Sequence, residues 1–202
     1  MLSERKPFRE VPDYWDTDAY IKNAEKNIKC VENTIDDFEF HQDKVLVCGR
    51  GTTDHPDFSP RFSTPTTKIK SDLYVTVDHS PRYARFITKK GNYALALIVH
   101  PNVPKKIMSV GGKIYWFTPE YLNYDLPKIS FGKNSGLAII AIASHFKVKS
   151  VLLSGIYLTG RYSQFRENAK SILQNVHQNG MKVFTLNGQL GELITYEKWR
   201  EL

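Results

Sequence analysis

The chain has 202 residues, of which 41% are hydrophobic and 24% are charged. These proportions are close to those of globular proteins, so they exclude a wholly disordered chain, and the length suits one domain with a substantial core. Twenty-eight lysines and arginines against 21 aspartates and glutamates give a net charge of +7, which favours an anionic ligand. Nucleic acid stays open as a partner, although the basic residues are scattered rather than gathered in a run.

The sequence contains no targeting or membrane signal. Residues 1–16 lack an apolar signal core, and no apolar run is long enough to span a membrane. The two cysteines, Cys30 and Cys48, do not have the spacing of metal ligands, and the apolar strand pattern around Cys48 is typical of a buried free thiol. We therefore expect a cytoplasmic protein.

Apolar residues at helical spacing predict a first helix that begins at Asp16 or Thr17 and ends near Phe40. We expect residues 1–43 to form an arm and a helix that pack on the main domain, which comprises residues 44–202.

The first clear strand, residues 44–48, leads directly into Gly49-Arg50-Gly51-Thr52-Thr53. A strand followed by Gly-x-Gly is typical of the start of a nucleotide-binding turn, because glycine lets a phosphate or ribose approach the backbone. No third glycine follows, so the dinucleotide fingerprint is incomplete, and the chain has no Walker lysine pattern.

A second strand, residues 73–77, follows a loop predicted over residues 58–70 and ends in Asp78-His79. Ligands of parallel sheets bind at the carboxyl ends of strands, where Asp78 would bond a ribose or hold a metal. The alternative is that Asp78 only forms the turn before Ser80-Pro81.

The remaining chain alternates strands with helices. The pattern predicts strands over 94–99, 114–117, 150–154 and 182–186, helices over 81–90, 137–146 and 163–179, and a tail over 190–202 that includes a short helix. We therefore predict an α/β fold, a single Rossmann-like domain with a mostly parallel sheet flanked by helices.

Within residues 131–162, the polar Asn134-Ser135-Gly136 precedes a helix that is apolar on nearly every side. Asn134 or Ser135 would cap this helix and direct its first N–H groups into the crevice at the strand ends, where they favour an anion. The alternative is a cap with a close packing contact and no ligand.

The turn at Gly49-Arg50-Gly51, the start of the helix at Asn134-Ser135-Gly136 and the strand over 151–156 resemble the corresponding elements of bacterial sialyltransferases. The same order of elements is similar to that of hydroxymethylpterin pyrophosphokinases, flagellin-glycosylation accessory proteins and small phage proteins, in which a strand ending in Asp resembles residues 73–78. The resemblance implies that Gly49, Gly51 and Thr53 lie at the nucleotide and that Ser135 and Gly136 approach its phosphate or sugar part, with Asp78 near the donor. We expect the backbone N–H groups of Gly51 and Ser135 to contact this ligand.

The sequence departs from the sialyltransferase pattern in four ways, one of which is Thr52-Thr53 in place of Pro-Ser. Arg50 replaces the usual Asn, and Tyr157 stands where the family pattern has Asp. The lid that carries the catalytic His of that family has no counterpart, because Ser163 opens the next helix almost at once.

Glycosyl transfer without a metal requires donors for the departing phosphate and a base near the acceptor. The candidate nucleotide-binding residues are Gly49, Arg50, Gly51, Thr53, Asn134, Ser135, Gly136, Tyr157, Arg161 and Tyr162, the candidate catalytic residues are His79 and Asp78, and no metal site is predicted.

The leading hypothesis is a metal-independent, sialyltransferase-like glycosyltransferase that uses a nucleotide-sugar, most simply a CMP-sugar. One alternative is a pyrophosphokinase that transfers from ATP to a small heterocycle or alcohol, with Mg²⁺ held by Asp78 as its cofactor. The other is a non-catalytic module that binds a nucleotide or a protein partner. The sequence therefore leans towards an enzyme without deciding it.

Overall fold

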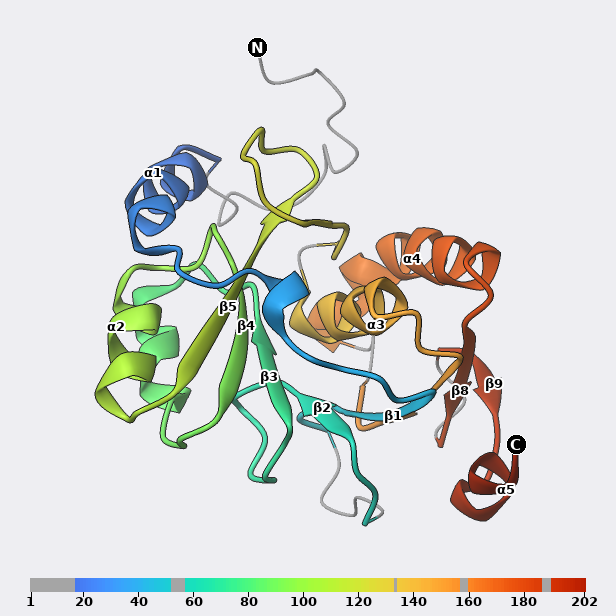
Figure 1. Ribbon diagram of the computed structural model, residues 1–202. Helices are drawn as coiled ribbons and strands as arrows, with labels where there is room; N and C mark the ends of the chain where they lie inside the picture. Colours follow the sequence, from blue (N-terminus) through green and yellow to red (C-terminus); the bar gives the residue numbers. More distant parts are fainter. Residues whose placement is uncertain (1–16, 52–56, 133, 157–159, 187–189) are drawn as a thin grey trace.

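The computed structural model describes residues 17–51, 57–132, 134–156, 160–186 and 190–202, and for residues 160–162 it describes the backbone only. Within these ranges the chain forms an all-parallel, nine-stranded sheet with helices on both faces (Figure 1). This architecture confirms the predicted α/β class.

The strands, in chain order, are β1 (Lys44–Cys48), β2 (Arg61–Ser63), β3 (Leu73–Thr76), β4 (Asn92–Ala96), β5 (Lys113–Pro119), β6 (Lys128–Ile129), β7 (Ser150–Ser154), β8 (Lys182–Thr185) and β9 (Glu192–Leu193). The α-helices are α1 (Thr17–Asn27), α2 (Asn102–Ser109), α3 (Ser135–His145), α4 (Arg166–Gln178) and α5 (Tyr196–Glu201). The 3₁₀ turns are η1 (Ile28–Cys30), η2 (Ile35–Asp37), η3 (Pro81–Phe86) and η4 (Gly160–Phe165).

The strand order, β6-β5-β4-β3-β2-β1-β7-β8-β9, reverses direction beside β1. The chain first builds outwards from β1 to β6, then crosses back through α3 to place β7 on the other side of β1. In open parallel sheets, such a reversal leaves a crevice at the carboxyl ends of the two strands, and ligands bind there. The predicted turn at residues 49–51 follows β1, so it lies at this switch point.

Alternate residues of β1 face opposite sides of the sheet, as the period of two requires. Val45 and Val47 point into the larger core, whereas Leu46 and Cys48 pack with Trp199 of α5 on the other side. Burial of the Cys48 thiol raises its pKa to about 12, so it is an inert packing group, as predicted.

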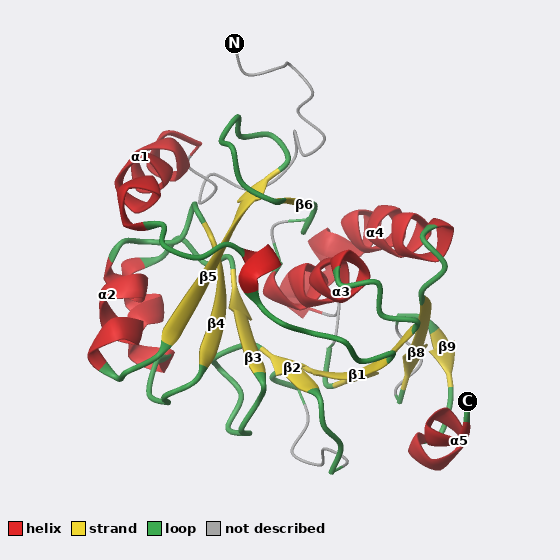
Figure 2. Cartoon of the chain, viewed as in Figure 1, coloured by secondary structure: helices red, strands yellow, loops and turns green. Residues whose placement is uncertain are grey.

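Helix α3 lies between the sheet and α4, and the two helices are neighbours in Figure 2. This position explains why its sequence is apolar all round, since most of its side chains are buried on one side or the other. No described helix has the length and apolarity needed to cross a membrane.

The first helix ends at Asn27, which corrects the predicted end near Phe40. Beyond it, Asn33 accepts a hydrogen bond from the Trp116 N–H (2.9 Å), and Thr34 forms a parallel bridge with Trp116. This pairing with β5 requires extended backbone, so the helix cannot continue, and the apolar Ile35 is buried from the short turn η2 instead.

The prediction of an uninterrupted loop over residues 58–70 is wrong at β2, which pairs with β1 and β3. Helix α2 and the two-residue strands β6 and β9 were not predicted. The predicted helix over 81–90 is the 3₁₀ turn η3, and the one over 163–179 begins as η4 and continues as α4.

Candidate functional site

The turn after β1 is bonded to the segment after β7. The Gly49 N–H donates to the Ser154 carbonyl oxygen (2.7 Å), and the Gly51 N–H donates to the Gly155 carbonyl oxygen (2.9 Å). Gly155 has a φ of +67°, in the left-handed region that favours glycine. The switch point is therefore closed by backbone contacts, and the Gly51 N–H that we expected to face a phosphate is engaged within the protein.

Gly49 is glycine because the neighbouring backbone leaves no room for a side chain. A Cβ at this position would collide with the Gly155 carbonyl group and would lie 2.8 Å from Cγ1 of Ile156. The close approach that the Gly-x-Gly pattern predicts is thus present, and at Gly49 the approaching group is the protein's own chain.

Ile156 joins the two glycine-bearing segments. Its side chain is 6% exposed, and a Cβ at Gly136 of α3 would lie 3.4 Å from its Cγ2 atom. The segments around Gly49 and Gly136 therefore meet across Ile156 at one edge of the sheet, as the fold prediction required.

Asn134 is the N-cap of α3, which confirms that part of the prediction. Its Oδ1 atom accepts hydrogen bonds from the N–H groups of Gly136 (2.8 Å) and Leu137 (3.2 Å). The Ser135 hydroxyl oxygen accepts a hydrogen bond from the N–H of Val77, just after β3 (3.2 Å). Asn134 thus satisfies N–H groups at the start of α3, and Ser135 fixes this helix to the carboxyl end of β3.

Asp78 and His79 follow β3 but point to different neighbours. Asp78 Oδ1 accepts a hydrogen bond from the Ser80 N–H (2.8 Å), which is the turn geometry of the alternative hypothesis. Its second carboxylate oxygen accepts no hydrogen bond from a described residue. The His79 ring packs edge-on against Tyr20 of α1, with ring centres 4.9 Å apart. His79 is therefore turned towards α1.

Arg50 is exposed at the tip of the turn after β1 and makes no hydrogen bond or ion pair with the described residues. Thr53 and Tyr157 lie outside the described residues, and for Arg161 and Tyr162 only the backbone, within η4, is described.

A second group of residues was missed by the sequence reasoning. His100 directly follows the strand predicted over residues 94–99, and that position was the available signal, although β4 itself ends at Ala96. Partial burial and the nearby charges of Lys26, His79 and Lys105 lower the pKa of His100. Its Nδ1 atom accepts the Asn102 N–H at the start of α2 (3.1 Å), which requires that nitrogen to be unprotonated.

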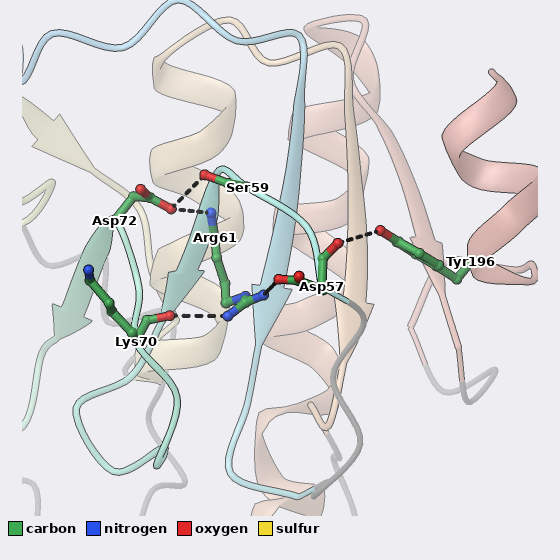
Figure 3. Close-up of polar contacts among 6 residues, drawn as sticks. All are labelled: Asp57, Ser59, Arg61, Lys70, Asp72 and Tyr196. Atoms are coloured by element: carbon green, nitrogen blue, oxygen red, sulfur yellow. Dashed lines mark hydrogen bonds and ion pairs between the residues drawn. The ribbon is translucent and has the colours of Figure 1, made fainter.

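Arg61 is the centre of a polar network at the opposite, amino-terminal edge (Figure 3). Its guanidinium donates to the Lys70 carbonyl oxygen (3.3 Å) and pairs with Asp57 (3.4 Å), and its backbone N–H donates to Asp72 (2.8 Å). Tyr196 of α5 donates to the Asp57 carbonyl oxygen (3.0 Å). These contacts join the segments on both sides of β2 to α5, so their role is structural.

A hollow of about 330 Å³ lies between β6, α3 and α4. Its lining includes Glu120, Lys128, His145 and Asn175, and none of the predicted site residues. His145 contacts Asp36 of η2 (2.6 Å), which explains its position at the end of α3. The hollow is open and polar, and it is separate from the switch point.

The described residues contain no cluster of three or more His, Cys, Asp or Glu side chains that could hold a metal ion. No family model, curated protein or solved structure matches the chain, so the resemblance to sialyltransferases and pyrophosphokinases stays a prediction from the residues.

Proposed function

We propose that the chain binds a nucleotide or nucleotide-sugar at the carboxyl edge of the sheet, beside β1, β7 and the start of α3. The observation that carries this proposal is the position of Arg50, an exposed cation at the switch point between β1 and β7. Switch points are the general ligand sites of open parallel sheets.

The fixed backbone around Arg50 supports a role in binding an anion. The glycines on either side of it donate to the carbonyl oxygens of Ser154, at the end of β7, and Gly155, just after it, so the turn that presents the guanidinium is fixed at both ends. A guanidinium offers a planar set of N–H donors that matches the oxygens of a phosphate. The net charge of +7 would favour the approach of such a ligand.

Glycosyl transfer from a nucleotide-sugar, without a metal, is the reaction that we assign to this site. The second carboxylate oxygen of Asp78, which accepts no hydrogen bond from a described residue, is the candidate base. Asp78 is half-buried at the carboxyl end of β3, two strands away from β1. A non-catalytic nucleotide-binding module is the second candidate. It is favoured by the engagement of the other Asp78 oxygen in a turn and by the packing of His79 on Tyr20.

The proposal is tested by thermal unfolding with CMP, UDP, GDP, ATP and their sugar conjugates at millimolar concentration, with and without EDTA. A ligand present at 100 times its Kd raises the free energy of unfolding by about 2.7 kcal/mol, so even weak binding is visible. Chromatography of the same mixtures detects cleavage of the nucleotide-sugar. Stabilisation with cleavage supports the transferase, and stabilisation alone supports the module. Conversion of ATP to AMP that EDTA abolishes would favour the pyrophosphokinase chemistry, and no stabilisation by any nucleotide would overturn the proposal.

A further inference from the structure

We infer that residues 17–30, 81–90 and 102–109 present a surface that binds the phosphate backbone of a nucleic-acid duplex without reading its sequence. These three segments, called the basic face below, comprise α1 with η1, η3 with the turn that follows it, and α2. They are far apart along the sequence, and the fold brings them together. The inference does not depend on the nucleotide proposal.

The basic face carries the whole excess charge of the chain. Its three segments contain nine lysines and arginines against two acidic residues, Asp18 and Glu25. Removing them from the totals of 28 basic and 21 acidic residues leaves 19 of each sign, so the rest of the chain has no net charge. Such an uneven distribution indicates the side of a protein that a polyanion approaches.

Two of the three segments, η3 and α2, cover the same face of the sheet. The chain moves from β3 to β4 to β5 in one direction, and right-handed crossovers place both connections on one side. The two elements contact each other, and a Cβ at Gly111, just after α2, would lie 3.8 Å from Cδ of Lys90. The turn after η3 therefore meets the end of α2.

The third segment, α1, is fixed beside the other two. The side chains of Asn23 and Asn27 are buried and donate to the carbonyl oxygens of residues 97–99 (2.8–3.1 Å). Those residues connect β4 to α2, so α1 lies next to the start of α2 (Figure 1). The Tyr20 ring also packs against His79, just before η3, with ring centres 4.9 Å apart. Contacts thus join α1 to both other segments.

The basic side chains of this surface face solvent with one exception. Eight are exposed: Lys22, Lys26, Lys29, Arg82, Arg85, Lys90, Lys105 and Lys106. None of the eight forms an ion pair with a described residue. The ninth, Lys89, is half-buried and donates to the carbonyl oxygens of Thr67 and Ile69. The exposed cations are therefore available to the phosphates of a ligand.

The aromatic residues of the basic face favour a duplex over a single strand. Proteins that bind single strands stack the bases on accessible aromatic rings. Here Tyr20 and Tyr83 are buried, Phe86 is half-buried, and the Arg85 guanidinium lies over the Phe86 ring at 4.8 Å. A duplex keeps its bases stacked and presents its phosphates outwards, where separate lysines and arginines can contact them. Such contacts give affinity without sequence preference.

An anionic membrane is a second polyanionic surface, and the basic face suits it less well. Helices that lie on a membrane insert an apolar face into it. The apolar side chains of α1 and α2, such as Tyr20, Val103 and Ile107, are buried in the core instead. Among the described residues of the basic face, Met108 is the one large hydrophobic side chain that is exposed. The surface therefore has charge to offer but little apolar area.

The test is a fluorescence-anisotropy titration of labelled DNA duplexes with the intact chain, using two unrelated sequences and several salt concentrations. Both duplexes should bind equally, and the affinity should fall steeply as salt rises, because bound lysines and arginines displace counterions from the phosphates. A single strand of the same length should bind more weakly. Absence of duplex binding at low salt would overturn the inference. So would equal affinity for the single strand, or binding to phosphatidylglycerol vesicles without binding to duplexes.

A fourfold variant tests the location of the surface. It carries Lys22→Gln, Lys26→Gln, Lys105→Gln and Lys106→Gln. It should bind the duplex about tenfold more weakly or worse, and the slope of log affinity against log salt should become shallower by about four, about one for each lost phosphate contact. Its thermal unfolding should match that of the original protein, since all four side chains are exposed.

The matched control removes the same charge at the side of the sheet formed by β7, β8 and β9. It replaces four exposed lysines by glutamine: Lys149, Lys170, Lys182 and Lys198. Two of them form exposed ion pairs, which contribute little to stability. This control should retain duplex binding, and so should Arg50→Ala, which separates the basic face from the nucleotide site. Equal losses in the two fourfold variants would overturn the inference, because binding would then follow net charge.

Discussion

The backbone of Gly49 lies against the carbonyl group of Gly155, so closely that a side chain at position 49 has no space. The Gly49 N–H donates to the adjacent Ser154 carbonyl oxygen at the same point. The join between β1 and β7, on which the switch point depends, is therefore made by backbone atoms that only glycine allows to approach.

Gly49→Ala should destabilise the protein by about 1–3 kcal/mol, because the added methyl group must displace buried backbone and the Ile156 side chain. Chemical denaturation of the ligand-free protein measures this change. The neighbouring Arg50→Ala is the control and should shift stability by no more than about 0.5 kcal/mol, since Arg50 is exposed. An unchanged midpoint for Gly49→Ala would contradict the packing role of this glycine.

Asn134→Ala should lower stability by about 0.5–2 kcal/mol, because the N–H groups of Gly136 and Leu137 lose their acceptor. Asn134→Asp should retain most of the stability, since a carboxylate oxygen caps a helix equally well. Denaturation curves of the three proteins make the comparison. If Asn134→Ala loses nothing, the two hydrogen bonds do not contribute to stability.

The strands that are buried on both faces were predictable from the sequence. Residues 44–48 and 150–154 were predicted, and they form β1 and β7 with those bounds. A continuous apolar run indicates such a strand from the local sequence alone, without knowledge of its partners. The same holds for the cap at Asn134, because a polar side chain before an apolar helix satisfies free N–H groups wherever that helix packs.

Elements that depend on distant partners were not predictable. β2 is a three-residue strand within a Ser-, Thr- and Pro-rich segment, and only its pairing with β1 and β3 makes it a strand. The end of α1 is set by the contact of residues 33 and 34 with Trp116, more than 80 positions away. The glycine spacing predicted close approach at Gly49, but it could not distinguish a ligand from the protein's own Gly155 carbonyl group.

Trp199→Ala should cost about 3–5 kcal/mol, the usual loss for a large aromatic side chain removed from a core. Trp199 is fully buried, and its indole N–H donates to the Ser150 hydroxyl oxygen (3.2 Å). Tyr196→Phe is the control on the same helix, because it removes only the bond to the Asp57 carbonyl oxygen at an exposed site. Thermal unfolding of both variants tests whether α5 is part of the cooperative fold, and equal melting temperatures would show that it is not.

Stability should fall as the pH drops below 6.5, in part because of His100. Its pKa in the folded protein is below the ordinary value of 6.5, so the unfolded chain takes up this proton first as the pH falls. The contribution of neutral His100 is therefore complete above pH 6.5 and is lost between that pH and its lowered pKa.

His100→Asn isolates this effect, because an asparagine oxygen can keep accepting the Asn102 N–H without titrating. Both proteins are denatured at pH values of about 5 to 8, a range that spans the ordinary histidine pKa. The free energy of unfolding of the variant should fall less steeply than that of the original protein as the pH is lowered. Parallel curves would assign the acid sensitivity to other groups.

Arg50→Ala should weaken nucleotide binding by about 1.5–3 kcal/mol, the usual contribution of a hydrogen bond to a charged group. Arg50 makes no ion pair with a described residue, so its guanidinium is available to a ligand, and its loss should leave the fold intact. Arg50→Lys should recover part of the affinity, because an ammonium group keeps the charge but lacks the planar arrangement of donors. Calorimetric titration of the tightest nucleotide into the three proteins measures the differences. Equal affinities would remove Arg50 from the binding site, and the nucleotide proposal would lose the observation that carries it.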